Sequence, residues 1–192
     1  MTSPFILTIF GASGDLAKIK IFPALYSMMA EKKLPKEFFI IGFARTEKTR
    51  EAFQQEFKKN VIAHSPRAVN KSLLKRLVDR VHYFTGEYDN APDYEKFTRF
   101  IDEKLSTLPR HSARGPFQYI FYFSVPPTVF RPIIQHLGES RFHQKNKNLR
   151  LVIEKPFGED AASALELFHF VARYFTDEQI FLLDHYLGKP AV

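Results

Sequence analysis

The 192-residue sequence contains no cysteine, so disulfide bonds and cysteine-ligated zinc or iron–sulfur centres are excluded. No stretch approaches the roughly 18 consecutive apolar residues of a membrane-spanning helix. The N-terminus has neither the basic segment nor the cleavage site of a secretory signal. Internal repeats, low-complexity segments and domain linkers are also missing. We therefore expect a single cytoplasmic domain of ordinary size, for which 45% hydrophobic residues provide enough core.

The net charge is +7, which suits either a nucleic-acid binder or a protein that holds phosphorylated small molecules. Lysine and arginine are scattered along the chain with acidic residues between them. The densest basic runs, Lys71 to Arg80 and Arg141 to Arg150, fall on expected helix faces and loops. No RNA-binding motif with interleaved aromatic residues is present. We interpret these runs as solvated surface and expect no nucleic-acid partner.

Apolar strand patterns alternate with amphipathic helix patterns along the chain. The expected strands cover residues 5–10, 38–43, 81–85, 117–124, 149–153 and 180–183. Later helices are expected at 49–63, 71–80, 92–108, 129–137 and 161–175. Strands that alternate with helices form βαβ units, whose right-handed crossovers place helices on both faces of the sheet. The predicted fold class is therefore α/β, with a Rossmann-type, doubly wound, mostly parallel sheet.

A further helix is expected after the first strand. Its apolar residues are predicted to share one side: Leu16, Ile19, Phe22, Leu25, Tyr26 and Met29. Pro23 lies within this segment and either kinks the helix or restarts it.

The first strand ends in a turn that contains two glycines. Its residues are Gly11, Ala12, Ser13, Gly14, Asp15, Leu16, Ala17 and Lys18. Glycine permits a sharp strand-to-helix turn and lets a phosphate approach the backbone. The usual dinucleotide fingerprint is Gly-x-Gly-x-x-Gly, whereas this turn reads Gly-x-x-Gly-x-x-Ala. This stretch alone is compatible with two interpretations, a pyrophosphate loop and an ordinary strand-to-helix turn.

Five residues that suit ligand binding lie at the carboxyl ends of expected strands: Gly11, Arg45, Ser124, Lys155 and Asp184. Ligands of parallel α/β sheets bind at the carboxyl ends of strands, so we expect these residues to converge. NAD-specific folds place an acidic residue after the second strand, where this chain has Arg45 and Thr46. An arginine fork suits a 2′-phosphate and favours NADP, although a surface arginine on a loop is the alternative.

Two later strand ends carry further polar groups. Lys155 can donate to a phosphate or a hydroxyl in the cleft, and we hypothesise that a cis Lys155–Pro156 bond fixes its direction. After the final strand, Asp184 can orient a histidine as a base, and a phosphate can be held by His185, Tyr186 and Lys189. The other histidines show no ligand spacing, so no metal is expected.

These pieces together resemble glucose-6-phosphate dehydrogenases, and they run in that family's order over nearly the whole chain. The matching stretches are Gly11 to Lys18, Gly42 to Arg45, Phe121 to Thr128, Glu154 to Gly158, and Asp184 to Lys189. The resemblance implies oxidation of D-glucose 6-phosphate to 6-phosphogluconolactone with hydride transfer to NADP⁺, the first oxidative step of the pentose phosphate pathway.

The resemblance also implies a role for each matching residue. Gly11 to Lys18 would form the pyrophosphate loop, Arg45 would take the 2′-phosphate, and Tyr122 would line the coenzyme side. Lys155 would bridge coenzyme and sugar, and Lys20 would approach the substrate. The sugar phosphate would be held by His185, Tyr186 and Lys189, and Asp184 would orient the catalytic histidine.

In the family, the general base comes from a downstream α+β domain that also supplies the dimer interface. No histidine of this chain stands in that position, and Pro190 follows Lys189 where the family usually has glutamate. We therefore interpret residues 1–192 as the NADP-binding domain of a larger homodimeric or tetrameric enzyme. Alone, it is expected to be monomeric, to bind NADP weakly and not to turn over.

Two alternatives remain open from the sequence. One is another NADP-dependent sugar oxidoreductase, because the Glu-Lys-Pro stretch also occurs in enzymes of the glucose–fructose oxidoreductase type. The other is a non-catalytic nucleotide-sensing or nucleic-acid-binding module, which the positive charge suggests.

Overall fold

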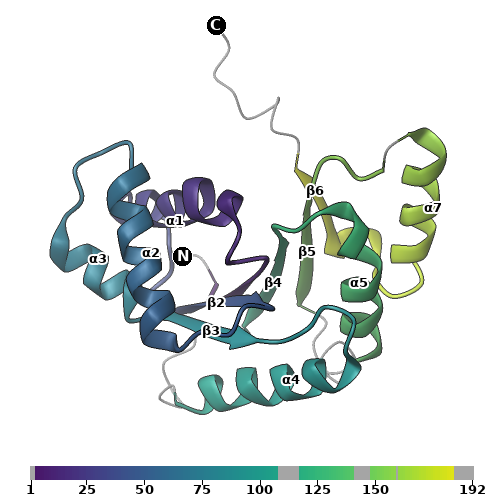
Figure 1. Ribbon diagram of the computed structural model, residues 1–192, viewed down its shortest axis with the longest axis horizontal. Helices are drawn as coiled ribbons and strands as arrows, with labels where there is room; N and C mark the ends of the chain where they lie inside the picture. The colour runs from purple at the N-terminus through teal and green to yellow at the C-terminus, as the bar shows by residue number, and fades with distance from the viewer. Residues whose placement is uncertain (1–2, 108–116, 141–147, 159, 184–192) are drawn as a thin grey trace, which may run out of the picture.

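The computed structural model describes residues 3–107, 117–140, 148–158 and 160–183. They form one six-stranded sheet in which every neighbouring pair is parallel, in the order β3-β2-β1-β4-β5-β6 (Figure 1). The strands are β1 (Phe5–Phe10), β2 (Phe38–Ala44), β3 (Val81–Thr85), β4 (Gln118–Phe123), β5 (Leu149–Glu154) and β6 (Ile180–Leu183). The predicted doubly wound α/β fold and all six expected strands are therefore confirmed.

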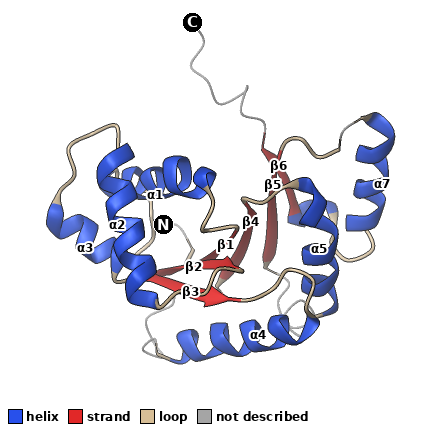
Figure 2. Cartoon of the chain, in the orientation of Figure 1, coloured by secondary structure: helices blue, strands red, loops and turns tan. Residues whose placement is uncertain are grey.

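Helices cover both faces of the sheet (Figure 2). The main helices are α1 (Phe22–Ala30), α2 (Arg50–His64), α3 (Lys71–Val78), α4 (Ala91–Ser106), α5 (Phe130–Glu139) and α7 (Ala161–Val171). Short 3₁₀ turns at Pro127–Val129 and Asp177–Gln179 precede α5 and β6. None of the helices in the described ranges is long and apolar enough to cross a membrane.

Two separate hydrophobic cores lie on the two faces. Helices α1, α2 and α3 pack on one face through a core that includes Phe22, Phe53 and Phe57. Helices α4, α5 and α7 pack on the other face, where Phe10 and Phe43 lie at the centre of an aromatic cluster. Side chains of β1 and β2 point alternately to the two faces of the sheet and are buried in the core on each face. This explains why both strands are continuous apolar runs in the sequence.

The segment after β1 corrects one expectation. Ala17–Ile21 is a π-helix, shown by the bond from the Phe22 N–H to the Ala17 carbonyl, and α1 then begins with Pro23 in its first turn. Proline is tolerated there because its missing N–H needs no partner. Ile21 and Phe22 keep helical dihedral angles, so the helix continues through this point and changes only its hydrogen-bond pattern. The wider π-turn breaks the 3.6-residue period, and Ile19, predicted to share one side with the buried Phe22 and Leu25, is 42% exposed.

Side-chain caps explain where two of the helices begin. The Thr49 hydroxyl accepts a hydrogen bond from the Ala52 N–H at 3.1 Å at the start of α2. The Asn70 side chain accepts from the backbone N–H groups of Ser72 and Leu73, both at 3.0 Å, at the start of α3. These caps satisfy N–H groups that a helix start leaves without partners.

Candidate functional site

The order of the strands reverses between β1 and β4, which lie side by side at the centre of the sheet. In open α/β sheets, ligands bind in the crevice outside the carboxyl ends of strands at such a switch point. Gly11 directly follows β1 and Ser124 directly follows β4, and the Ser124 N–H donates to the Phe10 carbonyl at 2.9 Å. The predicted convergence of these two strand ends is confirmed.

The glycine turn is shaped by close backbone packing. Gly11 has a φ of +80°, and a Cβ placed on it would lie 2.1 Å from the Ser124 carbonyl oxygen. Its N–H donates to the Phe43 carbonyl at 2.9 Å, and the Gly14 N–H donates back to the Gly11 carbonyl at 2.8 Å. Only glycine fits this position, so the turn is held tightly against the ends of β2 and β4.

A polar residue at the end of β4 lies against this turn. The Ser124 hydroxyl is buried and has no hydrogen-bond partner in the described part of the protein. A buried polar atom without a partner is costly and is commonly satisfied by a ligand or water. Together with the glycine turn, this hydroxyl fits the phosphate-bearing middle of a dinucleotide.

Arg45 follows β2, and its side chain lies over an aromatic residue that the sequence did not single out. Its guanidinium carbon is 5.6 Å from the centre of the Tyr88 ring. Burial raises the pKa of Tyr88, against the effects of the Arg45 charge and of a hydrogen bond from the Gly11 backbone. Tyr88 therefore links the glycine turn to Arg45. The sequence signal that could have identified Tyr88 is its position three residues after the end of β3.

Lys18, predicted to lie in the pyrophosphate loop, is held by a carboxylate of α2. Its ammonium group lies 2.8 Å from Glu56, which also pairs with Lys48 beyond β2. Burial opposes ionisation of Glu56, but the hydrogen bonds from the two lysines outweigh it and lower the pKa of that carboxyl. Glu56, also absent from the sequence-based predictions, thus ties the segment after β1 to the segment after β2.

Tyr122, predicted to line the coenzyme side, lies half-buried on β4 and donates a hydrogen bond to the buried Glu154 carboxylate of β5. Burial and the neighbouring Glu154 raise the pKa of the Tyr122 hydroxyl. Lys155 follows immediately and is exposed at the carboxyl end of β5. The Lys155–Pro156 bond is cis, as predicted.

The remaining predicted residues are placed as follows. Asp15 and Lys20 are exposed, in the turn and in the π-helix respectively. Those after β6 lie outside the described residues: Asp184, His185, Tyr186 and Lys189. Within the described ranges, no group of histidine, aspartate and glutamate could hold a metal ion.

Residues 8–192 match the family described as glucose-6-phosphate dehydrogenase, NAD binding domain. The chain belongs to the glucose-6-phosphate dehydrogenase family. It is 37% identical to glucose-6-phosphate 1-dehydrogenase of Chlamydia pneumoniae over 98% of its own length, and 38% identical to that of Schizosaccharomyces pombe over 97%.

Solved structures of the family show the same fold. A glucose-6-phosphate dehydrogenase in complex with its substrate glucose-6-phosphate has a TM-score of 0.84 at 33% identity over 98% of this chain. The enzyme from Mycobacterium avium has a TM-score of 0.80 at 28% identity over 97%. The chain spans 36–37% of the two relatives named above and 37–39% of these two structures.

Proposed function

We propose that this chain binds NADP⁺ for the oxidation of D-glucose 6-phosphate to 6-phosphogluconolactone. The family match over residues 8–192 supports the reaction, and the Gly11 turn at the switch point supports the coenzyme. When bound, NADP⁺ accepts the hydride from C1 of the sugar. The chain's own part is to hold the coenzyme at the carboxyl ends of β1, β2 and β4.

The proposed coenzyme contacts follow the glycine turn and the end of β2. Backbone groups of Gly11 to Lys18 would hold the pyrophosphate, since no side chain blocks its approach at Gly11. Arg45 would bind the 2′-phosphate, and its packing on Tyr88 reduces the conformational freedom it loses on binding. Because no acidic residue stands directly after β2, NADP is preferred over NAD in this proposal.

On the substrate side, Lys155 would reach both coenzyme and sugar from the end of β5, and Lys20 would approach the sugar. The sugar phosphate would be held by His185, Tyr186 and Lys189, and Asp184 would orient the catalytic histidine of a further segment. These roles come from the family resemblance, and the exposure of Lys20 and Lys155 is compatible with them.

The general base and the dimer interface would come from an α+β domain beyond these residues. The isolated chain would then be a monomer that binds NADP weakly and does not oxidise the sugar. Loss of a general base alone lowers rates by about 10²–10⁴-fold. A cytoplasmic location stays a prediction.

The test is calorimetric titration of the purified chain with NADP⁺ and with NAD⁺. We expect NADP⁺ to bind more tightly, and Arg45→Ala to weaken NADP⁺ about tenfold or more while leaving NAD⁺ within about twofold, because only NADP⁺ carries the 2′-phosphate. Arg99→Ala, an exposed arginine of α4, is the matched control and should change neither. Equal affinity for both coenzymes in the unmodified chain would contradict the proposed preference.

A further inference from the structure

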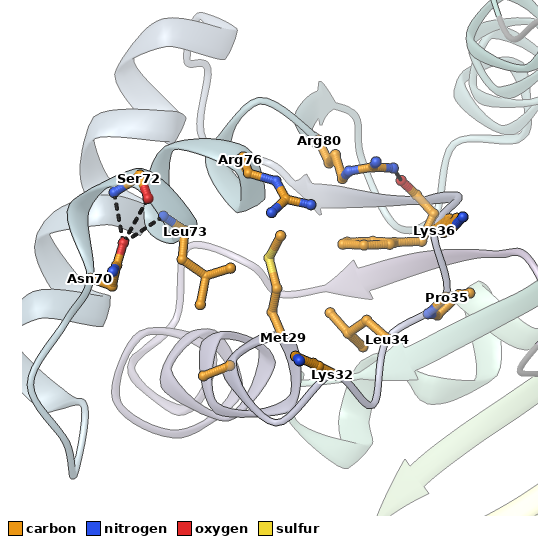
Figure 3. Close-up of a pocket in the computed structure, with 12 residues that line it drawn as sticks. Met29, Lys32, Leu34, Pro35, Lys36, Asn70, Ser72, Leu73, Arg76 and Arg80 are labelled. Atoms are coloured by element: carbon orange, nitrogen blue, oxygen red, sulfur yellow. Dashed lines mark hydrogen bonds between the residues drawn. The ribbon is translucent and has the colours of Figure 1, made fainter.

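A basic pocket lies at the end of the sheet opposite the coenzyme site. It is a cavity of about 520 Å³ between the end of α1, the start of β2 and helix α3. Its floor is apolar, and its cationic residues are Lys32, Lys36, Arg76 and Arg80 (Figure 3). Because β2 separates the pocket from Arg45 by about 20 Å at roughly 3.3 Å per residue, the two sites are distinct.

One cation of the pocket, Arg80, contacts Phe38 in two ways. The Arg80 guanidinium lies 4.8 Å from the centre of the buried Phe38 ring and donates to the Phe38 carbonyl at 3.3 Å. Arg76 extends from α3 toward Met29 of α1 on the opposite wall (Figure 3). Burial and the nearby Arg76 charge lower the pKa of Arg80, against the attraction of Glu37. The two arginines thus concentrate positive charge on one side of the cavity.

Two carboxylates near the pocket are engaged with other partners, whereas Glu37 lies near enough to attract Arg80. Glu31 pairs with Lys33 at 2.6 Å and with Arg67 at 3.5 Å, and Asp79 pairs with Lys75 at 3.0 Å. No carboxylate lines the cavity itself. Within the described residues, its four cationic side chains form no ion pair. A multiply charged anion would satisfy them.

We propose that the basic pocket binds a small metabolite that carries a diphosphate or two phosphate groups on a short apolar body. Guanidinium forks match phosphate oxygens in pairs, which suits Arg76 and Arg80. The apolar body would contact Met29 and Leu34. The volume lies within the range of about 300–1,000 Å³ typical of small-molecule sites. This site goes beyond the coenzyme function and does not depend on it.

The test is titration of the ¹⁵N-labelled chain with inorganic pyrophosphate, followed by nuclear magnetic resonance. Amide signals of Leu73 and Arg76 report on the basic pocket, and those of Gly11 and Ser13 report separately on the glycine turn. We expect saturable shifts at Leu73 and Arg76. The double variant Lys36→Ala/Arg76→Ala should weaken this binding about tenfold or more, because two charge-assisted contacts are lost.

The matched control, Lys58→Ala/Lys71→Ala, removes two exposed lysines of α2 and α3 outside the pocket and should leave the affinity within about twofold. Shifts confined to Gly11 and Ser13, no saturable shift, or equal losses in both double variants would overturn the proposal. Butyl diphosphate should bind at least about threefold more tightly than pyrophosphate if the apolar floor takes part. Equal affinities for butyl diphosphate and pyrophosphate would overturn the proposed contact with the apolar floor.

Discussion

The two halves of the sheet differ in how they are covered. Strands β1, β2 and β3 lie between two helical layers, so Ile9, Phe10 and Phe43 are 0% exposed. Strands β4, β5 and β6 are packed by α5 and α7 on one face, whereas Phe181 of β6, which lies against the exposed Arg150 on the other face, is 42% exposed. The first half of the sheet is therefore covered on both faces. The second half has one face that the described residues cover only in part.

This difference predicts where the chain's stability resides. Burial of apolar surface is the main favourable contribution to folding, so a fully packed half contributes more than a half with one open face. The glycine turn lies at the boundary between the two halves, where Gly11 of the covered half meets Ser124 of the open half. Substitutions in the two halves should therefore give unequal effects.

The largest difference is expected between two phenylalanine truncations. Phe57→Ala removes a ring that is 0% exposed and lies 4.6 Å from the Phe22 ring, so it should lower the free energy of unfolding by about 3–5 kcal/mol. Phe181→Ala in β6 should cost less than about 1 kcal/mol, because that ring is already partly in water. Urea unfolding curves measure both, and similar losses would contradict the comparison.

At the boundary between the two halves, Gly11→Ala should lower the free energy of unfolding by about 2–5 kcal/mol, because the added Cβ meets the Ser124 carbonyl and the backbone φ is positive. Gly14→Ala is the matched control. Its Cβ would lie 3.2 Å from the Gly11 carbonyl with no positive φ, so we expect a loss of about 1 kcal/mol or less. Thermal unfolding of the two variants decides this, and a larger loss for Gly14→Ala would refute it.

His82 of β3 should make the covered half sensitive to acid. It packs between Phe39 and Phe100, and neither ring nitrogen has a partner in the described ranges. Burial, assisted by Arg50 and Lys104, lowers its pKa to about 4. The unfolded chain, with a histidine pKa of about 6.5, binds more protons below that pH, so stability falls as the pH drops from about 6.5 toward 4.

Between pH 7.5 and pH 5 the loss from His82 should be about 2 kcal/mol, measured as the change in unfolding free energy in urea. His82→Phe should remove this loss, because the replacement has no group to protonate. His64→Gln, at the exposed end of α2, is the control and should keep it. The same pH dependence in His82→Phe would show that other groups cause it.

The smallest effect is expected in the open half. Tyr122→Phe removes the hydroxyl that donates to the buried Glu154 carboxylate and should cost about 1–2 kcal/mol. Tyr174→Phe removes a similar bond to Glu139, at 3.3 Å on the surface, and should cost less than about 0.5 kcal/mol. Equal losses in thermal unfolding would show that burial of the acceptor does not matter.

The sequence alone determined the strands, the fold class and the strand-end residues. Each strand is a local apolar run, and Gly11, Arg45 and Lys155 follow such runs directly. Most helices were also predicted to within a few residues because their apolar periodicity is local. The prediction that Ile19 shares the buried side of its helix was wrong, because a π-turn changes that periodicity and no residue type in the sequence signals it.

Only the tertiary structure decided the strand order and the partners of the candidate site. Tyr88, Glu56 and Glu154 contact Arg45, Lys18 and Tyr122 respectively, across 32 to 43 residues of sequence. The basic pocket likewise joins α1, β2 and α3. Local patterns fix backbone conformation, whereas such contacts depend on how the crossovers stack elements that are distant in the chain.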